Sequence, residues 1–430
     1  MLQRIPLAAL LVCATLGSSQ AADLLTVYHA ALENDPQLHA AAAQRDAARL
    51  QEPLARARLL PAITLNSGVN AIHSDSDHDR FSHTNASLGI ALTHPLYHRD
   101  RQLQREQARD QGEQAETRYS AAAQGLMIRI ASAYFTILAA EDNLGFVRAQ
   151  KSAIDRQLEQ AKQRFEVGLI AITAVHEAQA VSDQASANLI HAANQLDNAR
   201  EALREILHSD LTASQRLAAT IPLEIPAPAD SNAWSELALN NSPAVQAAAQ
   251  GLEIARKEIE VQRSARYPAV DLVAAHNIDR NSGNRRSDLD SSSIGVRLSV
   301  PLWLGGSIAT STEQSRYRFE EARQQLDQQR RRVNREVRDA YRAVEAGISS
   351  VHALQASIVS ARSALEATQA GFDVGTRTMV DVLNAEQNLY GILSAHATAR
   401  YNYLIARLQL RQAAGVLSEA DLAQVNQWLK

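Results

Sequence analysis

The tetrapeptide FEVG at residues 165–168 recurs as FDVG at residues 372–375, and this pair belongs to a duplication that runs through the chain. Two further motifs repeat at the same spacing of 207 residues: NDP, which starts at Asn34, returns as NSP, and LPA, which starts at Leu60, returns as YPA. A register held over such a distance indicates one structural unit present twice.

This duplication sets the domain organisation that we predict for the 430 residues. The first repeat is expected at 22–220 and the second at 230–430, interlocking as one domain. The segment 221–229 contains three prolines and is expected to link them. Residues 1–21 are predicted to be a signal peptide, because Arg4 precedes a short apolar run that ends in a small-x-small cleavage site.

The composition favours closely packed helices over a large aromatic core. Hydrophobic residues make up 46% of the chain but aromatic residues only 4%, and much of the apolar share is alanine. A net charge of −4 gives no electrostatic reason to expect nucleic acid as a partner. Cys13 is the only cysteine and lies in the predicted signal peptide, so we expect no disulfide or thiol chemistry in the mature chain. Lipidation of Cys13 is disfavoured because Val12 stands where a small residue is wanted.

Hydrophobic periodicity predicts helices of very unequal length. Two long helices are expected at about 96–166 and 307–373, each on the order of 100 Å long at about 1.5 Å per residue. Each ends near a glycine and is followed by a returning helix, at about 176–207 or 380–414. Shorter helices are predicted at 24–58 with a break at Pro36, at 234–240, and at 244–266.

Each repeat also contains two segments in which the hydrophobic period changes to two. In the first repeat they lie at about 63–71 and 86–93, separated by a polar loop at 73–85. The second repeat has the same arrangement around a polar loop at 277–292, and Pro95 and Pro301 are expected to end the outgoing strands. Strands of roughly 9–11 residues that alternate apolar and polar side chains are typical of transmembrane barrels.

Four such strands cannot close a barrel alone. About eight are needed to enclose even a filled interior, and open strand edges cannot lie in lipid. Several chains would therefore share one barrel, with eight strands for a dimer and twelve for a trimer. The long helices would project away from the membrane as a tube.

Two other classes of protein make different demands on the sequence. A periplasmic coiled-coil structural or adaptor protein would need the helices but no membrane strands. An enzyme is not expected, because no nucleophile elbow, catalytic carboxylate pair or zinc helix is present. The histidines and aspartates between 73 and 83 match no closed set of metal ligands, so we predict a solvated loop and neither a metal nor a cofactor.

Three segments carry a resemblance to the TolC family of outer-membrane exit ducts: 165–173, 374–383 and 399–405. The resemblance covers essentially the whole mature chain. It implies a mixed α and β fold in which a homotrimer forms a twelve-stranded barrel in the outer membrane of a Gram-negative cell, continued by a periplasmic helical tunnel. It also implies partners, namely a periplasmic adaptor (membrane fusion) protein and an inner-membrane ABC or proton-driven transporter, in type I secretion or multidrug efflux.

The resemblance further implies a gate at the periplasmic tip of the tunnel, where Arg377, Asp381 and Thr173 match the family motif. Phe372 stands where close relatives carry a tyrosine, and Ala174 stands where they carry an acidic partner for the arginine. We therefore expect a looser gate or a different set of acceptors.

A second acidic position of the family pore is occupied here by Asn384. The sequence therefore predicts one ring of carboxylates, from Asp381, instead of two.

Two further sets of residues are predicted to contact partners. The turns between the paired helices match the family's adaptor-docking tips: Val167, Gly168, Leu169, Val374, Gly375 and Thr376. Tyr97 and Trp303 follow equivalent strand ends, where aromatic side chains often lie at a membrane interface.

Overall fold

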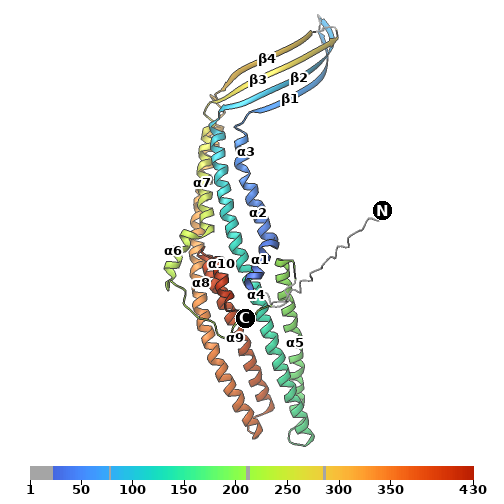
Figure 1. Cartoon of the computed structure of the whole chain (residues 1–430), viewed down its shortest axis with the longest axis vertical. Helices are drawn as coiled ribbons and strands as arrows, with labels where there is room; N and C mark the ends of the chain where they lie inside the picture. Colours follow the sequence, from blue (N-terminus) through green and yellow to red (C-terminus); the bar gives the residue numbers. More distant parts are fainter. Residues whose placement is uncertain (1–22, 77–78, 210–213, 284–286) are drawn as a thin grey trace, which may run out of the picture.

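The chain is elongated, with a sheet at one end and the tips of long helices at the other (Figure 1). The computed structural model describes residues 23–76, 79–209, 214–283 and 287–430, so the predicted signal peptide lies outside the described residues. The sheet contains β1 (Ala62–Ser76), β2 (Asp79–Tyr97), β3 (Ala269–Gly283) and β4 (Ser287–Ser299). The long helices are α4 (Arg99–Glu166) and α8 (Ser307–Asp373), with returning helices α5 (Ile172–Leu207) and α9 (Met379–Ala413). The shorter helices are α1 (Leu24–Asn34), α2 (Pro36–Arg49), α3 (Gln51–Ala57), α6 (Ser231–Asn241), α7 (Pro243–Ser264) and α10 (Glu419–Asn426).

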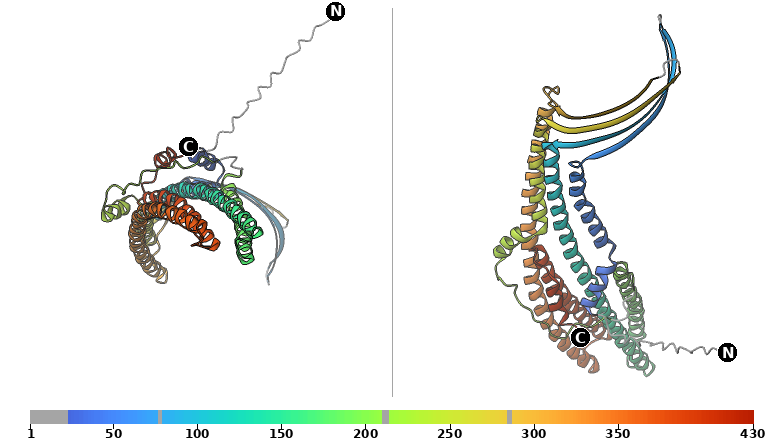
Figure 2. Two further views of the ribbon diagram at one scale, coloured as in Figure 1. Left: turned by 90° about the horizontal axis from the view of Figure 1, so that it is seen from below. Right: turned by 45° about the horizontal axis from the view of Figure 1, so that its top comes forward.

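The four strands form one antiparallel sheet in the order β1-β2-β3-β4. Pairing of β2 with β3 joins the two repeats, for example at Leu88↔Ile278. Figures 1 and 2 show the sheet leaning away from the helices as a curved ribbon. Near the helices one row of this ribbon is apolar from edge to edge, because the pairing aligns Ile63 with Leu92, Leu92 with Ala274, and Ala274 with Ile294. Farther out, the same face becomes polar on β3 and β4, where Ile90 is aligned with His276 and His276 with Ser292. The apolar side chains at both edges are largely exposed: Ile63, Leu65 and Val69 on β1, and Ile294, Val296 and Leu298 on β4.

The strands are longer than the sequence predicted, at 13 to 19 residues. The predicted polar loops at 73–85 and 277–292 were wrong, since pairs such as His73↔Ser82 and Asn277↔Ser291 continue both hairpins. Alternation of apolar and polar residues arises where one face of a strand is apolar, and it does not depend on backbone pairing. It is therefore absent from paired segments in which both faces are polar. Pro95 does not end β2 either: it pairs with Asp271 next to a register shift, a position that tolerates a residue without an N–H.

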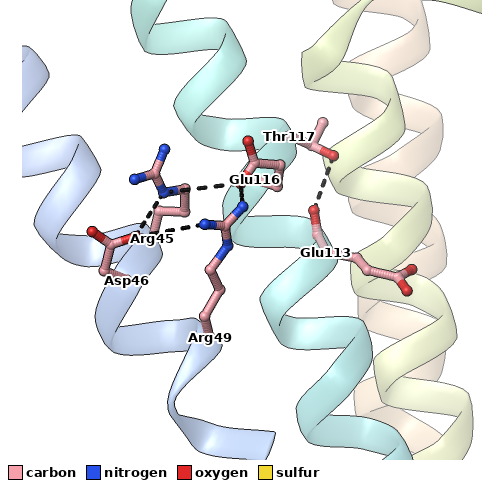
Figure 3. A network of polar contacts seen from close by, with 6 residues as sticks. All are labelled: Arg45, Asp46, Arg49, Glu113, Glu116 and Thr117. Atoms are coloured by element: carbon pink, nitrogen blue, oxygen red, sulfur yellow. Dashed lines mark hydrogen bonds and ion pairs between the residues drawn. The ribbon is translucent and has the colours of Figure 1, made fainter.

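The long helices were predicted to within a few residues, and they form two antiparallel hairpins, α4 with α5 and α8 with α9. The α9 helix also packs along α4, so the hairpins stand side by side in a curved wall (Figure 2). Two shorter helices continue this wall towards the sheet, because α2 packs on α4 and α7 packs on both α4 and α8. Where α2 contacts α4, Arg49 Nη2 lies 2.6 Å from Glu116 Oε2 (Figure 3).

The main apolar core lies at mid-height, between α4 and α9. Tyr134, Phe135, Tyr403 and Leu404 are all fully buried there. The two tyrosine hydroxyls bind the connecting segments: Gln215 N donates to Tyr134 Oη at 3.0 Å, and Glu224 N donates to Tyr403 Oη at 3.0 Å. In the described part of the chain, only α4 contains an apolar window that could cross a membrane by length and composition, and this window lies partly inside the core.

The break between α1 and α2 is fixed by the buried carboxylate of Asp35. Asp35 is 2% exposed, and its Oδ2 accepts a hydrogen bond from Leu38 N at 2.8 Å, which caps α2. The same oxygen pairs with the guanidinium of Arg129 on α4. The equivalent residue in the second repeat, Ser242, caps α7 without a side-chain hydrogen bond.

We expect Asp35→Asn to destabilise the protein by about 2 kcal/mol, because the amide can still cap α2 but leaves Arg129 without its counter-charge. Chemical denaturation of the detergent-solubilised protein measures this change. Ser242→Ala is the matched control and should leave the free energy of unfolding nearly unchanged. Equal losses for the two variants would contradict the role given to the ion pair.

Candidate functional site

Both hairpins end in turns built around a left-handed glycine. Gly168 has φ 75° and Gly375 has φ 79°, a conformation that glycine adopts without a steric cost. In the first turn Leu169 N donates to Arg164 O at 2.8 Å, and in the second Thr376 N donates to Gly371 O at 2.8 Å. The helix ends predicted at these two glycines are therefore confirmed, whereas the docking role of the turns stays a prediction.

These turns place apolar side chains at the free end of the molecule. Val167, Leu169 and Val374 are more than 70% exposed. Gly168, Gly375 and Thr376 are exposed beside them. Exposed apolar residues gathered at a free end are typical of a contact surface.

Asp381 has a partner within its own chain. Its Oδ2 accepts hydrogen bonds from Thr378 N and Thr378 Oγ1, both at 2.9 Å, and Asp381 N donates to Thr378 Oγ1 at 3.2 Å. This capping box begins α9. The hydrogen bonds from Thr378 and the nearby charge of Arg377 lower the pKa of the Asp381 carboxyl.

The Arg377 side chain is exposed and lies along Gly371. A Cβ added to Gly371 would come within 2.8 Å of Arg377 Cγ, so the absence of a side chain there makes room for the arginine. Within the described part of the chain, the Arg377 guanidinium makes neither a hydrogen bond nor an ion pair. Thr173, in the first turn of α5, is also exposed.

Phe372 is buried, at 6% exposure, in a small apolar cluster that joins the two hairpins near their tips. The cluster contains Ile154, Leu158 and Ala161 of α4, Ala178 and Ala185 of α5, and Met379, Val382 and Leu383 of α9. The guanidinium carbon of Arg164 lies 4.5 Å from the centre of the Phe372 ring, and Arg164 Nη2 lies 3.2 Å from Asp373 Oδ1.

Arg164 was missed by the sequence analysis. The signal was present in the duplication, because the equivalent residue of the second repeat is Gly371 while the residues on its C-terminal side are similar.

A second group that the sequence analysis missed lies a few turns above the tip. Glu386 of α9 is 8% exposed, and burial raises the pKa of its carboxyl, although the charge of Arg156 and a hydrogen bond from Gln157 offset part of this effect. Glu386 Oε2 and Gln157 Oε1 are both buried without a hydrogen-bond partner among the described residues. A protonated Glu386 carboxyl would provide a hydrogen-bond donor next to Glu386 Oε2 and Gln157 Oε1, neither of which now has a donor among the described residues.

The two aromatic residues predicted at the membrane interface lie where the sheet meets the helices. Tyr97 is the last residue of β2 and is 39% exposed. Trp303 is 84% exposed in the turn between β4 and α8, next to Leu302 at 93%. Their contact with lipid stays a prediction. The described residues contain no cluster of three or more possible metal ligands.

The sequence matches the family described as outer membrane efflux protein, at residues 27–208 and again at 234–416. The chain therefore belongs to this family, and the two matched segments correspond to the two repeats.

Among its relatives is Outer membrane protein TolC of Vibrio cholerae, which is 41% identical over 435 residues with 98% of each chain covered. TolC of Escherichia coli K12 is 35% identical, over 95% of this chain and 85% of the relative. Alkaline protease secretion protein AprF of Pseudomonas aeruginosa is 31% identical, over 94% and 86%. The chain is thus an outer-membrane exit channel of the kind that serves secretion and efflux.

Solved structures agree on the fold. CusC superposes with a TM-score of 0.81 at 19% identity, covering 91% of this chain and 92% of the other. VceC of Vibrio cholerae gives a TM-score of 0.78 at 20% identity, covering 91% and 96%. The four-stranded sheet and the family match together set aside the alternative of a coiled-coil protein without membrane strands.

We expect Glu386→Gln to stabilise the protein near neutral pH by about 1 kcal/mol, because it removes a carboxylate that burial keeps poorly solvated. The folded-state pKa is raised, so the folded form binds protons more readily and the penalty disappears as the pH falls through that pKa. Thermal unfolding in detergent should show a higher midpoint for the variant at pH 7 and convergence with the wild type near pH 4. A gain that persists unchanged at acidic pH would contradict this account.

Proposed function

We propose that three copies of the chain close one barrel and one tunnel, and that the hairpin tips form the gate of the tunnel. The observation that carries this proposal is the four-stranded sheet, which has an apolar row from β1 to β4 and two edges without a partner strand among the described residues. Such a sheet is stable in lipid only when its edges are paired. Three sheets give twelve strands, enough to surround an aqueous channel.

The proposed transport route follows from the length of the helices. The α4 helix has 68 residues and α8 has 67, so each spans on the order of 100 Å. They begin directly after the sheet, and a closed ring of them would continue the barrel into the periplasm. Cargo would come from an inner-membrane ABC or proton-driven transporter in type I secretion or multidrug efflux, with a periplasmic adaptor bridging the two membranes.

The proposed gate uses charged groups at the tips. Arg377 is exposed and free of partners in the described chain, while Asp381 is held at the start of α9 by Thr378. Three such pairs around an axis would place fixed charges at the narrow end of the tunnel, with Thr173 beside them. Phe372 would support the gate by packing, since its ring is buried and carries no hydroxyl.

The proposed adaptor contact uses the apolar side chains of Val167, Leu169 and Val374, which lie at the free end of each hairpin. A partner that covers them would gain apolar burial at both repeats, at about 25 cal/mol per Å² of covered surface.

Single-channel recording in a planar bilayer tests the gate. Purified protein should give discrete, long-lived openings of low conductance, and Arg377→Ala or Asp381→Asn should increase the leak about fivefold or more. Thr378→Ala separates the two roles of Asp381, because it removes the capping partner and keeps the carboxylate. Wild-type conductance in both gate variants would refute their role, and folded protein that never inserts would refute the channel.

The pH dependence of the leak gives a further test. The lowered pKa of Asp381 keeps its carboxyl charged through neutral and mildly acidic pH, and the stabilisation that this charge provides is lost only as the pH falls below about 3.8. We therefore expect conductance to stay flat from pH 7 to about pH 4 and to rise below it. Asp381→Asn should remove the part of the rise that this carboxyl contributes, and a rise centred near pH 6 would point to another group.

A further inference from the structure

The two repeats differ at the turn where each long helix ends. The sequence Arg164-Phe165-Glu166 of the first repeat corresponds to Gly371-Phe372-Asp373 of the second, at the spacing of 207 residues. Each repeat therefore presents a phenylalanine followed by a carboxylate. Only the first repeat has an arginine in front of them.

Within one chain, Arg164 joins the first hairpin to the second. Its guanidinium lies 4.5 Å from the Phe372 ring and 3.2 Å from Asp373. The C-terminus of α8 needs a cation. The helix has no basic residue in its last turn, and its last residue, Asp373, carries a negative charge where such a charge is unfavourable. A cation supplied by the neighbouring helix therefore satisfies both the carboxylate and the ring.

The equivalent groups of the first repeat have no such cation. Phe165 is 41% exposed, whereas Phe372 is 6% exposed. Glu166 is exposed and forms no hydrogen bond or ion pair with any residue that the structure describes. One ring and one carboxylate are thus left without a cation from the described residues at the tip of the first hairpin.

The second repeat has one arginine without a partner. Arg377 lies along Gly371, and its Cγ occupies the space that a side chain at Gly371 would need. The aliphatic part of Arg377 therefore occupies the place where an arginine at position 371, equivalent to Arg164, would begin. The guanidinium reaches no acceptor in the described chain.

The arrangement of three copies supplies the missing contact. In a closed ring of six hairpins the two repeats alternate, so the junction between repeats within one chain has a counterpart between neighbouring chains. The rotation about the ring axis that carries the first hairpin onto the second also carries the second hairpin onto the first hairpin of the next copy. Under this rotation Arg164 takes the place of Gly371, and Phe372 and Asp373 take the places of Phe165 and Glu166 of the partner subunit. Gly371 therefore faces Phe165 and Glu166 of the partner subunit.

We propose that Arg377 closes the gate by binding Glu166 of the partner subunit, with its guanidinium against Phe165 of the partner subunit. The inference rests on the proposed trimer and names the acceptor of its gate arginine. It explains how a guanidinium can be held although Ala174 offers it no carboxylate. The tip then has two kinds of junction, one closed within each chain by Arg164 and one closed between chains by Arg377.

Crosslinking between engineered cysteines tests the contact directly, because Cys13 is the only native cysteine and lies in the predicted signal peptide. Glu166→Cys with Arg377→Cys should be linked between subunits by a short bismaleimide. This reagent is preferred to a disulfide because an arginine and a glutamate pair at a greater Cα separation than a disulfide allows. The expected product on a denaturing gel has two or three times the mass of the chain.

The matched control is Arg164→Cys with Asp373→Cys, which should crosslink within one chain and leave its mass unchanged. Each single-cysteine variant should give no product. If the Glu166→Cys, Arg377→Cys variant gave only a product of monomer mass, or none while the control pair reacts in a conducting trimer, the assignment of Glu166 would be overturned and the proposed channel left intact. Absence of a trimer and of conductance would instead overturn the proposed function.

A double-mutant cycle on the leak gives an independent test. Glu166→Gln and Arg377→Ala should each raise it about fivefold, and the double variant should be no leakier than either, since both remove one interaction. Glu159→Gln removes an exposed carboxylate whose hydrogen bond is to Gln163 of its own helix, so its effect should add independently to that of Arg377→Ala. The exchanged pair, Glu166→Arg with Arg377→Glu, should recover most of the closure. Additive effects of Glu166→Gln and Arg377→Ala, with no recovery in the exchanged pair, would refute the contact.

Discussion

The backbone groups along the outer edges of β1 and β4 are the constraint on which the assembly depends. A strand edge in lipid has no water to bind, so each unpaired N–H and C=O there costs several kcal/mol. The sheet has exposed apolar side chains that suit lipid and two edges that do not. Association with other copies is therefore a condition for the sheet to lie in the membrane at all. In the proposed assembly, that closure also brings the hairpin tips around a common axis.

The duplicated sequence supplies the parts in a form that closure can use. Each repeat brings one strand hairpin and one helical hairpin, and pairing of β2 with β3 makes the two strand hairpins continuous. Packing of α9 along α4 does the same for the helices. Tyrosine hydroxyls at mid-height bind the segment between α5 and α6, which connects the two repeats. The two repeats are thus joined both in the sheet and in the helical wall, so neither repeat forms a separate domain.

Much of this architecture could be predicted from the sequence, and the limits have physical reasons. The long helices were placed to within a few residues because apolar periodicity persists along them, and the turns at Gly168 and Gly375 because a helix end needs a left-handed residue there. The outer parts of the strands were predicted as loops because polar pairing leaves no alternation. Arg164 and Glu386 could not be found from local patterns, since each acts through residues more than 200 positions away or on another helix.

The uninterrupted course of α4 and α8 has a mechanical consequence. Neither helix contains a proline, and each runs from the edge of the sheet to the tip. Sharp kinks in helices arise mainly at prolines and inserted residues, so these helices behave as stiff levers anchored at mid-height by the aromatic core. If the tip acts as the proposed gate, its widening would require tilting or bending of whole hairpins, with sliding along their shared seams. A small displacement of the hairpin tips would then be transmitted along the helices to the aromatic core, and the energy of the deformation would be distributed over the whole length of the helical wall.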